Sequence, residues 1–507
     1  MLLGAFSAEY SPERGTLFAV PSCRRGSKPK FCRLAGLLAG ILVLGSVQLA
    51  RGEEEEESVP PPSRQTAGIL EKPNGYHSPS VKQPVSRERF REFADWGSEG
   101  LTGDWFGLRN FAGDHGVAVG VRYVAISMGN LEGGFDTGFF GGGPLGVTVT
   151  LDTESLVGWK GGTLFFDWEF FNWYNKRYSP NRQYDPSGSY VGSNTNFIDD
   201  TQTILNQVAQ LYYEQALFDD VLTVAFGKID SNVTYSSVGP AAAFQDSIAM
   251  YTSTLNPFMP TYPNEATALS VTLAPTDFFD VSVGWFDGTT AAYNPATGKS
   301  GPATGPRGPS TFFDNKGNWF LISQWNAKWE VDATRPGNAG VGGWIQTGRT
   351  ATAGSDERGA KNVPGFYLQW DQTVWSPGEE MASQGGGVRF FGQFGWSDPK
   401  KNPVEWSIMS GLSATGVIPG RPADALGVMG AYSQFTGRPG VYESTQPTGL
   451  PGASGGSESS IEFFYLAQLT AWLYVQPGLL WIHTPGGGDP APIDDATMLD
   501  LLVGLDF

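Results

Sequence analysis

The last ten residues of the chain, MLDLLVGLDF, alternate with a period of two. One face carries apolar side chains: Leu499, Leu501, Val503, Leu505 and Phe507. Because successive side chains of a strand point to opposite faces of a sheet, this pattern predicts a β-strand with one apolar face. Pairing of this strand with the first strand would remove both edges, so we expect the terminal strand to lie in the wall of a closed sheet.

The same alternation recurs in residues 319–329 (WFLISQWNAKW) and 366–374 (FYLQWDQTV). Each segment has about ten residues, the length at which a tilted strand crosses the hydrocarbon layer of a bilayer. After Ala50 no apolar run reaches about eighteen residues, so a closed barrel is the remaining way to satisfy backbone polar groups in lipid. We therefore predict an all-β, transmembrane antiparallel β-barrel, in which the roughly 410 residues from Gly97 onward hold about sixteen strands.

Aromatic residues gather within and at the ends of the apolar stretches, as the interfacial girdles of an outer-membrane barrel require. The rings predicted for these girdles are Trp168, Trp173, Tyr174, Trp319, Trp329, Trp370, Trp375, Trp472 and Tyr474. In water so many exposed rings would favour aggregation, whereas at a bilayer interface the ring body is buried and its polar tip is hydrated. The rings therefore favour a membrane barrel over a soluble sandwich, which would also show alternation.

The N-terminal part has a different character. An apolar run from Leu34 to Ala50 follows several basic residues and ends on a small residue, so we predict an export signal over residues 1–50. A single membrane helix is the alternative. Residues 51–96 begin with EEEEESVPPP and are predicted to form a disordered periplasmic linker with a possible short helix at 86–96. Residues 97–507 then form the barrel.

Composition and charge narrow the function. Glycine (68 residues) and aromatic residues (13%) are abundant while charged residues are few (17%), which is typical of strands and turns. The net charge of -18 disfavours nucleic acid as a partner. Both cysteines, Cys23 and Cys32, precede the apolar run, and the two histidines of the barrel region, His115 and His483, lie in turn-like sequences. We predict no enzyme activity, metal or cofactor.

Several segments, in order along the chain, resemble the OprB-like carbohydrate-selective porins of the Gram-negative outer membrane. Residues 101–134 contain a Thr-Gly-Asp-Trp turn, a Gly-Leu-Arg and a Gly-Asn-x-x-Gly-Gly turn. Residues 395–428 (GWSDPKKNPVEWSIMSGLSATGVIPGRPADALGV) form a long and specific match. The further matching segments are LVGWKGGTLFF, LYYEQALFDDVLTVAFGKID and LTAWLYVQPGLLWIHTPGG. Phe106 stands where many family members carry glycine.

The resemblance covers Leu101 to Phe507. It implies a sixteen-stranded barrel in the outer membrane that passes small sugars by diffusion, often as a homotrimer. The expected partners are therefore sugars, outer-membrane lipids and the assembly machinery, which is understood to read a terminal strand ending on an aromatic residue such as Phe507.

A sugar channel needs hydrogen-bonding groups that replace the hydration of hydroxyls, and each contact must be weak enough to release the sugar. By alternation, the polar side chains opposite the apolar faces point into the lumen. The candidate lining is Arg122, Asp167, Glu169, Gln210, Glu214, Gln324, Lys328, Asp371, Arg389 and Gln393. We expect Lys328 and Arg389, with the inward carboxylates, to narrow and polarise the pore. The alternative is that these residues are solvated and paired with neighbours across the wall.

Two long polar loops, residues 175–200 and about 289–316, could fold into the lumen, but a position on the surface is favoured. The predicted function is passive, carbohydrate-selective diffusion of small sugars. A general or cation-preferring pore, favoured by the acidic balance, and a surface carbohydrate-binding module on a β scaffold are the alternatives.

Overall fold

The computed structural model of the protein describes residues 99–174, 191–193, 204–262, 264–289, 293–294, 299–300, 309–315, 317–351, 358–436, 455–487 and 493–507. The predicted export signal (1–50) and the linker (51–96) with its helix lie outside these residues, and both stay predictions.

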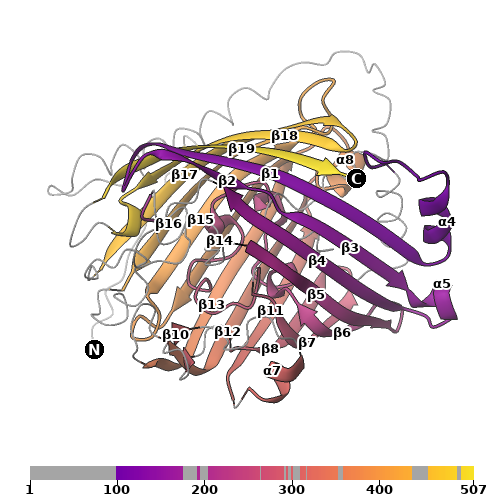
Figure 1. Cartoon of the computed structure of the whole chain (residues 1–507), viewed down its shortest axis with the longest axis horizontal. Coiled ribbons are helices and arrows are strands. Elements are labelled where there is room, and N and C mark those ends of the chain that lie inside the picture. Colours follow the sequence, from indigo (N-terminus) through magenta and orange to yellow (C-terminus); the bar gives the residue numbers. More distant parts are fainter. Residues whose placement is uncertain are drawn as a thin grey trace, which may run out of the picture. The chain divides into compact units, whose positions relative to one another are not determined.

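Seventeen strands form one antiparallel sheet that closes on itself (Figure 1). They are β1 (Val117–Gly134), β2 (Gly138–Gly142), β3 (Leu145–Asp152), β4 (Gly162–Tyr174), β5 (Ile204–Leu217), β6 (Leu222–Ile229), β7 (Ala266–Thr276), β8 (Phe279–Asp287), β11 (Trp319–Glu330), β12 (Pro336–Ala351), β13 (Arg358–Trp375), β14 (Gly387–Ser397), β15 (Val404–Thr415), β16 (Ala425–Phe435), β17 (Gly456–Thr470), β18 (Leu473–His483) and β19 (Asp494–Asp506). Because β2 and β3 both pair with β1 and with β4, they fill one place in the wall. The wall therefore has sixteen places, and the predicted barrel is confirmed.

The barrel closes where its two end strands meet. β1 pairs with β19 in antiparallel register from Arg122↔Asp506 to Gly134↔Asp494, and Figure 1 shows the two strands side by side. Phe507 then donates its main-chain N–H to the carbonyl oxygen of Val121 at 2.8 Å. The terminal strand therefore lies in the wall, as its alternation predicts.

Shorter elements connect the strands. These are α4 (Leu108–Asp114), α5 (Thr153–Val157), α7 (Pro309–Phe313), α8 (Glu379–Ser383), the 3-10 turns η1 (Ser231–Val233), η2 (Gly239–Ala241), η3 (Ser247–Ala249) and η4 (Pro485–Gly487), and the small pair β9 (Tyr293–Asn294) and β10 (Lys299–Ser300). Helix α5 forms because the Asp152 carboxylate accepts the N–H groups of Glu154 and Ser155, and it ends at Gly158 with φ 75°. Within the described ranges no helix has the length and apolar character to cross a membrane.

The two faces of the wall differ in exposure as the alternation predicts. In β19, Met498 and Leu502 are 1% and 0% exposed, whereas Leu499 and Leu501 are each 44% exposed. Exposed rings such as Trp325, Trp329 and Trp375 continue this outer apolar surface around the barrel. In an outer-membrane barrel this is the surface that faces lipid.

One ring assigned to the girdles lies on the other face. Tyr474 is 3% exposed and belongs to the apolar core that includes Leu480 and Leu502. The reason is the period of two in β18, where Tyr474 shares its face with Leu480, whereas the outward Leu479 is 40% exposed. The prediction for Tyr474 is wrong. The side chains of Trp173 and Tyr174 lie outside the described part of the chain.

The segment between β6 and β7 fills much of the barrel. Residues 230–262, here called the lumen segment, are mostly buried and carry η1, η2 and η3. Their side-chain and main-chain contacts reach β7, β11, β14, β15 and β17, on opposite sides of the closed wall. Since one segment meets opposite sides of a closed wall, it crosses the lumen. No pattern described above for the sequence predicts this crossing.

Candidate functional site

Two predicted lining residues hold the lumen segment in place. Gln324 Oε1 on β11 accepts the N–H of Ser236 at 2.9 Å, and Gln393 Nε2 on β14 donates to the carbonyl oxygen of Ser236 at 3.2 Å. The Tyr367 hydroxyl on β13 donates to Gln324 Oε1 at 2.6 Å and fixes the amide. Gln324 and Gln393 point inward as predicted and are buried beneath the segment.

A carboxylate fixes the lumen segment on the side of the barrel formed by β17 and β18, here called the far wall. Glu462 on β17 accepts the main-chain N–H groups of Gln245 and Asp246 at 2.6 and 2.9 Å. Gln476 Nε2 on β18 donates to the carbonyl oxygen of Ala243 at 2.7 Å. Asp246 in turn accepts a short hydrogen bond from the hydroxyl of Ser460. Burial raises the pKa of Asp246 to about 7, against the opposing effect of the Ser460 hydrogen bond.

An acidic cluster surrounds the two ends of the lumen segment beside β4 to β7, here called the near wall. Lys228 Nζ on β6 lies 3.7 Å from Glu265 Oε2 and donates to the carbonyl oxygen of Val208 at 2.6 Å. The Asp230 carboxylate accepts the hydroxyl of Thr261 at 2.6 Å, which ties the two ends of the segment together. Burial raises the pKa of Glu265 to about 7, although Lys228 opposes this rise.

The predicted lining residues Asp167 and Glu169 belong to this cluster. Both point inward from β4 and are buried, and Asp167 Oδ1 accepts the hydroxyl of Thr148 at 3.1 Å. They therefore support the near wall beside Lys228. Gln210 lies opposite Asp167 on β5, where Ala209 is an extra residue that shifts the register between the two strands. This bulge turns both Gln207 and Gln210 into the barrel.

The lumen segment packs against apolar side chains on both sides of the barrel interior. One apolar cluster lies on the inner face of β14 to β19 with β1 and includes Phe244 and Ile248 of the lumen segment. A second lies on β4 to β8 and β11 to β13 and includes Tyr235 and Phe258 of the segment. The Phe244 ring lies 4.8 Å from Phe464 and 5.6 Å from Phe391 between centroids. The water-filled path therefore has to lie outside these two clusters.

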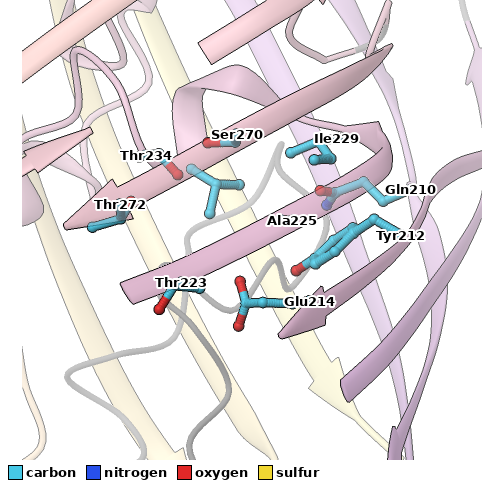
Figure 2. A pocket seen from close by; sticks show the side chains of 10 residues that line it. Gln210, Tyr212, Glu214, Thr223, Ala225, Ile229, Thr234, Ser270 and Thr272 are labelled. Carbon is cyan, nitrogen blue, oxygen red and sulfur yellow. The ribbon is translucent and has the colours of Figure 1, made fainter. Parts of the chain in front are cut away.

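A hollow lies on β5, β6 and β7 beneath the first turn of the lumen segment (Figure 2). Gln210, Tyr212 and Glu214 project into it from β5, and hydroxyl-bearing side chains of β6 and β7 face them. The predicted lining residues Gln210 and Glu214 are thus brought together.

A belt of polar side chains continues from the hollow over the next five strands. Its members are Asp280 on β8, Lys328 on β11, Asn338 on β12, Asp371 on β13 and Arg389 on β14. Lys328 Nζ lies 2.9 Å from Asp280 Oδ2, and Asp371 forms an ion pair with Arg389 and accepts a hydrogen bond from Asn338. Lys328 is 48% exposed and Arg389 21%, so both cations border open space. Each cation of the belt has a carboxylate partner.

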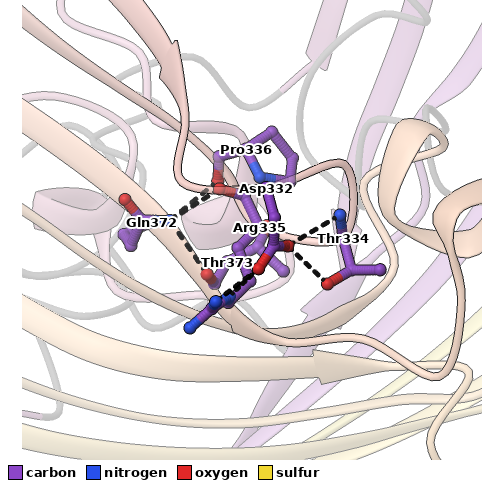
Figure 3. Close-up of polar contacts among 6 residues, drawn as sticks. All are labelled: Asp332, Thr334, Arg335, Pro336, Gln372 and Thr373. Carbon is purple, nitrogen blue, oxygen red and sulfur yellow. Dashed lines mark hydrogen bonds and ion pairs between the residues drawn. The ribbon is translucent and has the colours of Figure 1, made fainter.

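The belt is braced at the rim by the turn between β11 and β12 (Figure 3). Asp332 accepts hydrogen bonds from Arg335 and Thr334, and the bond from Arg335 is the larger cause that lowers the pKa of Asp332 to about 2. Gln372 of β13 donates to the carbonyl oxygens of Arg335 and Pro336 at 3.1 and 3.2 Å. These bonds join the turn between β11 and β12 to β13.

The last predicted lining residue, Arg122, lies at the seam of the barrel. Its Nε donates to Asp506 Oδ1 at 2.7 Å, and both side chains are buried. Arg122 thus joins β1 to β19 from the inside.

The two long loops lie mostly outside the described residues. Residues 191–193 of the first are buried, and Ser193 donates its hydroxyl to Glu458 Oε1 at 2.6 Å. In the second, Phe312 of α7 packs on the outer face of the wall against Phe226, Trp285 and Trp319. Within the described ranges, no group of three or more His, Cys, Asp or Glu side chains is placed to hold a metal ion.

Comparisons with known proteins agree on one kind of channel. The model of the family described as "Carbohydrate-selective porin, OprB family" matches residues 141–507. Porin B of Pseudomonas aeruginosa is 23% identical over 448 residues, which cover 80% of this chain and 91% of that protein. The high-pH structure of Pseudomonas putida OprB superimposes with a TM-score of 0.63 at 22% identity and covers 81% of this chain and 99% of that one.

Proposed function

Because the chain belongs to the OprB family of carbohydrate-selective porins of the outer membrane, we propose that small neutral sugars cross it along the belt of polar side chains in the lumen. The observation that carries this proposal is the belt of polar side chains, whose two cations, Lys328 and Arg389, border open space. A solute that passes there meets hydrogen-bonding groups at successive strands.

The pairing of the belt charges suits a neutral, polyhydroxylated solute. In the Lys328–Asp280 and Arg389–Asp371 pairs a donor and an acceptor lie next to each other, and a sugar hydroxyl can use both at once. Because each pair is neutral as a whole, it does not hold a free ion strongly. The free energy of a sugar hydroxyl changes little when its hydrogen bonds to water are replaced by hydrogen bonds to the belt. The sugar is therefore also released.

The runner-up is a cation-preferring pore. The net charge of -18 and the acidic cluster around Lys228 favour it. A zero-current potential near zero in a salt gradient, together with a conductance that falls when sugar is added, would decide for the sugar pathway. A cation-selective potential with no effect of sugar would decide for the runner-up.

The experiment compares liposome swelling by mono- and disaccharides with swelling by amino acids of equal size, in the wild type and in K328A and R389A. We expect the wild type to pass sugars faster than amino acids, and each variant to widen the path and reduce that preference. K160A, which removes an exposed lysine outside the belt, is the matched control. Equal rates for sugars and amino acids in the wild type would refute the selectivity. Unchanged conductance and sugar block in K328A and R389A would refute the role of the belt.

Two further partners are proposed from the family resemblance. Assembly machinery would engage the terminal strand that ends at Phe507, and three copies would associate through the outer faces of their walls. Crosslinking in native membranes tests the trimer, and truncation of Phe507 tests recognition by the assembly machinery.

A further inference from the structure

The Lys328–Asp280 pair of the belt is joined to the lumen segment by a row of hydrogen bonds, here called the amide chain. The main-chain N–H of Ser236 donates to Gln324 Oε1 at 2.9 Å, and Gln324 Nε2 donates to Asn326 Oδ1 at 3.0 Å. Asn326 Nδ2 then donates to Asp280 Oδ1 at 2.6 Å, while Asp280 Oδ2 lies 2.9 Å from Lys328 Nζ. Three side chains therefore connect the segment to a cation of the belt.

Every donor in the amide chain points the same way, from the lumen segment to the carboxylate. A carboxylate only accepts hydrogen bonds, so Asp280 fixes the orientation of the Asn326 amide, which in turn fixes that of Gln324. The Tyr367 hydroxyl adds a second donor to Gln324 Oε1 at 2.6 Å. Because each group in such a row polarises the next, the hydrogen bonds strengthen one another. The amide chain is therefore stiffer than its single bonds.

The register of the wall places these side chains next to one another. Gln324, Asn326 and Lys328 occupy every second position of β11, so they share its inner face. Asn326 lies directly opposite Asp280 on β8 and opposite Gly340 on β12. A Cβ added to Gly340 would lie 2.5 Å from Asn326 Oδ1, so glycine leaves the room that the amide needs. The amide of Asn326 is therefore positioned from both neighbouring strands.

The amide chain runs from buried to open surroundings. Gln324 is 3% exposed and Asp280 8%, whereas the Lys328 side chain is 48% exposed. The hydrogen bonds at the buried end are costly to break, because water does not replace them there. A lysine with the exposure of Lys328 samples many rotamers unless its partner is fixed. The position of Lys328 is therefore set by Asp280, and that of Asp280 by Asn326.

The second cation pair of the belt is built in the same way but lacks this connection. Asp371 forms an ion pair with Arg389 and accepts a hydrogen bond from the amide of Asn338. Within the described residues, no hydrogen bond joins Asn338 to the lumen segment. Of the two cation pairs, the one at Lys328 is thus the pair that the segment controls.

We propose that Asn326 is a positioning residue for Lys328, and that the lumen segment sets through the amide chain where this cation stands in the path. In this role Asn326 acts through Asp280 and not through contact with a solute. A movement of the segment away from Gln324 would release the carboxylate and, with it, the cation. The inference rests on the proposed function, because it concerns the placement of a residue of the same path.

The test measures how fast the Lys328 amine is acetylated by a small, water-soluble reagent in lipid vesicles, read by mass spectrometry of the peptide. D280N removes the partner of Lys328, and we expect acetylation to become about two- to fivefold faster, as for the loss of a partly exposed ion pair. N326L removes the donor to Asp280 and should give a rate between those of the wild type and D280N. The double variant should react no faster than D280N, because Asn326 acts through that carboxylate.

Two controls separate this role from a general disturbance of the barrel. Lys160, an exposed lysine outside the belt, is the reference in each sample and should react equally in all variants. N338L removes the corresponding amide from Asp371 and should leave the rate at Lys328 unchanged. The wild-type rate in N326L, an equal increase in N338L, or a further increase when N326L is added to D280N would overturn the role of Asn326.

A second variant disturbs the same contact without changing Asn326. G340A places a Cβ 2.5 Å from Asn326 Oδ1, so the amide has to move, whereas a Cβ at Gly343 on the same strand meets nothing within 4 Å. We expect faster acetylation of Lys328 in G340A and the wild-type rate in G343A. Equal rates in these two variants would contradict the inference.

Control by the lumen segment is tested at the first link of the amide chain. Q324L removes the acceptor of the Ser236 N–H and the donor to Asn326, and it should raise the acetylation rate of Lys328 as N326L does. The wild-type rate in Q324L would overturn the control by the segment. Failure of the proposed function looks different: the wild type would swell equally fast in sugars and amino acids, while the acetylation rates would still follow the amide chain.

Discussion

Arg109 and Phe507 are joined by a hydrogen bond across nearly the whole barrel sequence. The Arg109 Nη2 donates to the main-chain oxygen of Phe507 at 2.7 Å, and its Nη1 donates to the carbonyl oxygen of Gly103 at 3.1 Å. The guanidinium also lies 4.1 Å above the Trp105 ring. The Thr-Gly-Asp-Trp and Gly-Leu-Arg motifs at the start of the barrel therefore form a clamp on its last residue.

The first prediction concerns this clamp. In R109A the oxygen of Phe507 loses a charged donor, so we expect the free energy of unfolding in lipid vesicles to fall by about 2 kcal/mol. Arg421 supplies the control: it is more exposed, and its pair with Asp424 lies in a turn of the same rim. R421A should change stability less than R109A does, because solvent screens an exposed ion pair. Equal effects of the two substitutions would contradict the clamp.

Close packing of the N-terminal turn against the last residue gives a second prediction. A Cβ added to Gly100 would lie 2.5 Å from the main-chain carbon of Phe507, so G100A has to displace the terminal residue. We expect G100A to unfold at a lower urea concentration than the wild type. We also expect faster hydrogen exchange of the main-chain N–H groups that pair β1 with β19. A Cβ at Gly343 on β12 meets nothing within 4 Å, and G343A should be close to neutral. A stable G100A would show that the clamp tolerates movement.

Phe106 stands where family members often carry glycine, and its backbone explains the glycine. Its φ is 62°, in the left-handed region, and its ring is fully exposed. In F106G the folded chain loses about 1 to 2 kcal/mol of backbone strain, which stabilises it. This gain exceeds the loss of about 0.5 to 1 kcal/mol that follows from the greater conformational entropy of glycine in the unfolded chain. We expect a gain of about 0.5 to 1 kcal/mol in thermal or urea unfolding. A loss of stability would mean that the exposed ring has a binding partner.

The far-wall contact of the lumen segment controls the width of the path. In E462A the main-chain N–H groups of Gln245 and Asp246 lose their acceptor, and the segment should detach locally from β17. We expect larger single-channel conductance and more open-channel noise than in the wild type. D500N also removes an inward carboxylate, from β19, without a hydrogen bond to the segment in the described structure, and it should keep the wild-type conductance. Wild-type conductance in E462A would refute this control of the path.

The raised pKa of Asp246 predicts a pH dependence of the same contact. A carboxyl whose pKa rises on folding from about 4 to about 7 contributes stability that is full below pH 4 and lost as the pH rises to 7. Above pH 7 the Asp246 carboxylate repels Glu458 and faces Glu462, so the segment should loosen. We expect open-channel noise to increase with a midpoint near pH 7, and D246N to reduce this increase. A noise level independent of pH would contradict the assignment.

The faces of the wall could be predicted from sequence because a closed sheet imposes a strict period of two. Asp167 on β4, Lys328 on β11 and Arg389 on β14 accordingly lie on the inner face of the wall, and their role in lining the pore stays a prediction. The roles of individual inward residues were not predictable, since they depend on which strand faces which part of the lumen segment. Gln393 and Lys328 look equivalent in sequence, yet the first is buried under Ser236 and the second borders open space.

The lumen segment itself left a signal that periodicity does not detect. Residues 230–262 contain two charged residues, Asp230 and Asp246, in a stretch rich in small, hydroxylated and apolar side chains. A long connection exposed to water would carry more charge, so this composition indicates a buried loop. The bulge at Ala209 left no such signal, because one extra residue changes the register without changing the composition.

The inner face of β14 to β19 resembles the core of a water-soluble protein. Phe244 and Ile248 of the lumen segment belong to the same apolar cluster as Met409, Met429 and Phe464 of the wall. A barrel that closed before the lumen segment entered it would therefore expose an apolar cavity to the periplasm. We therefore expect insertion into the membrane and filling of the cavity to be coupled, and smaller side chains in place of the interior methionines should weaken the whole barrel as well as its contact with the lumen segment.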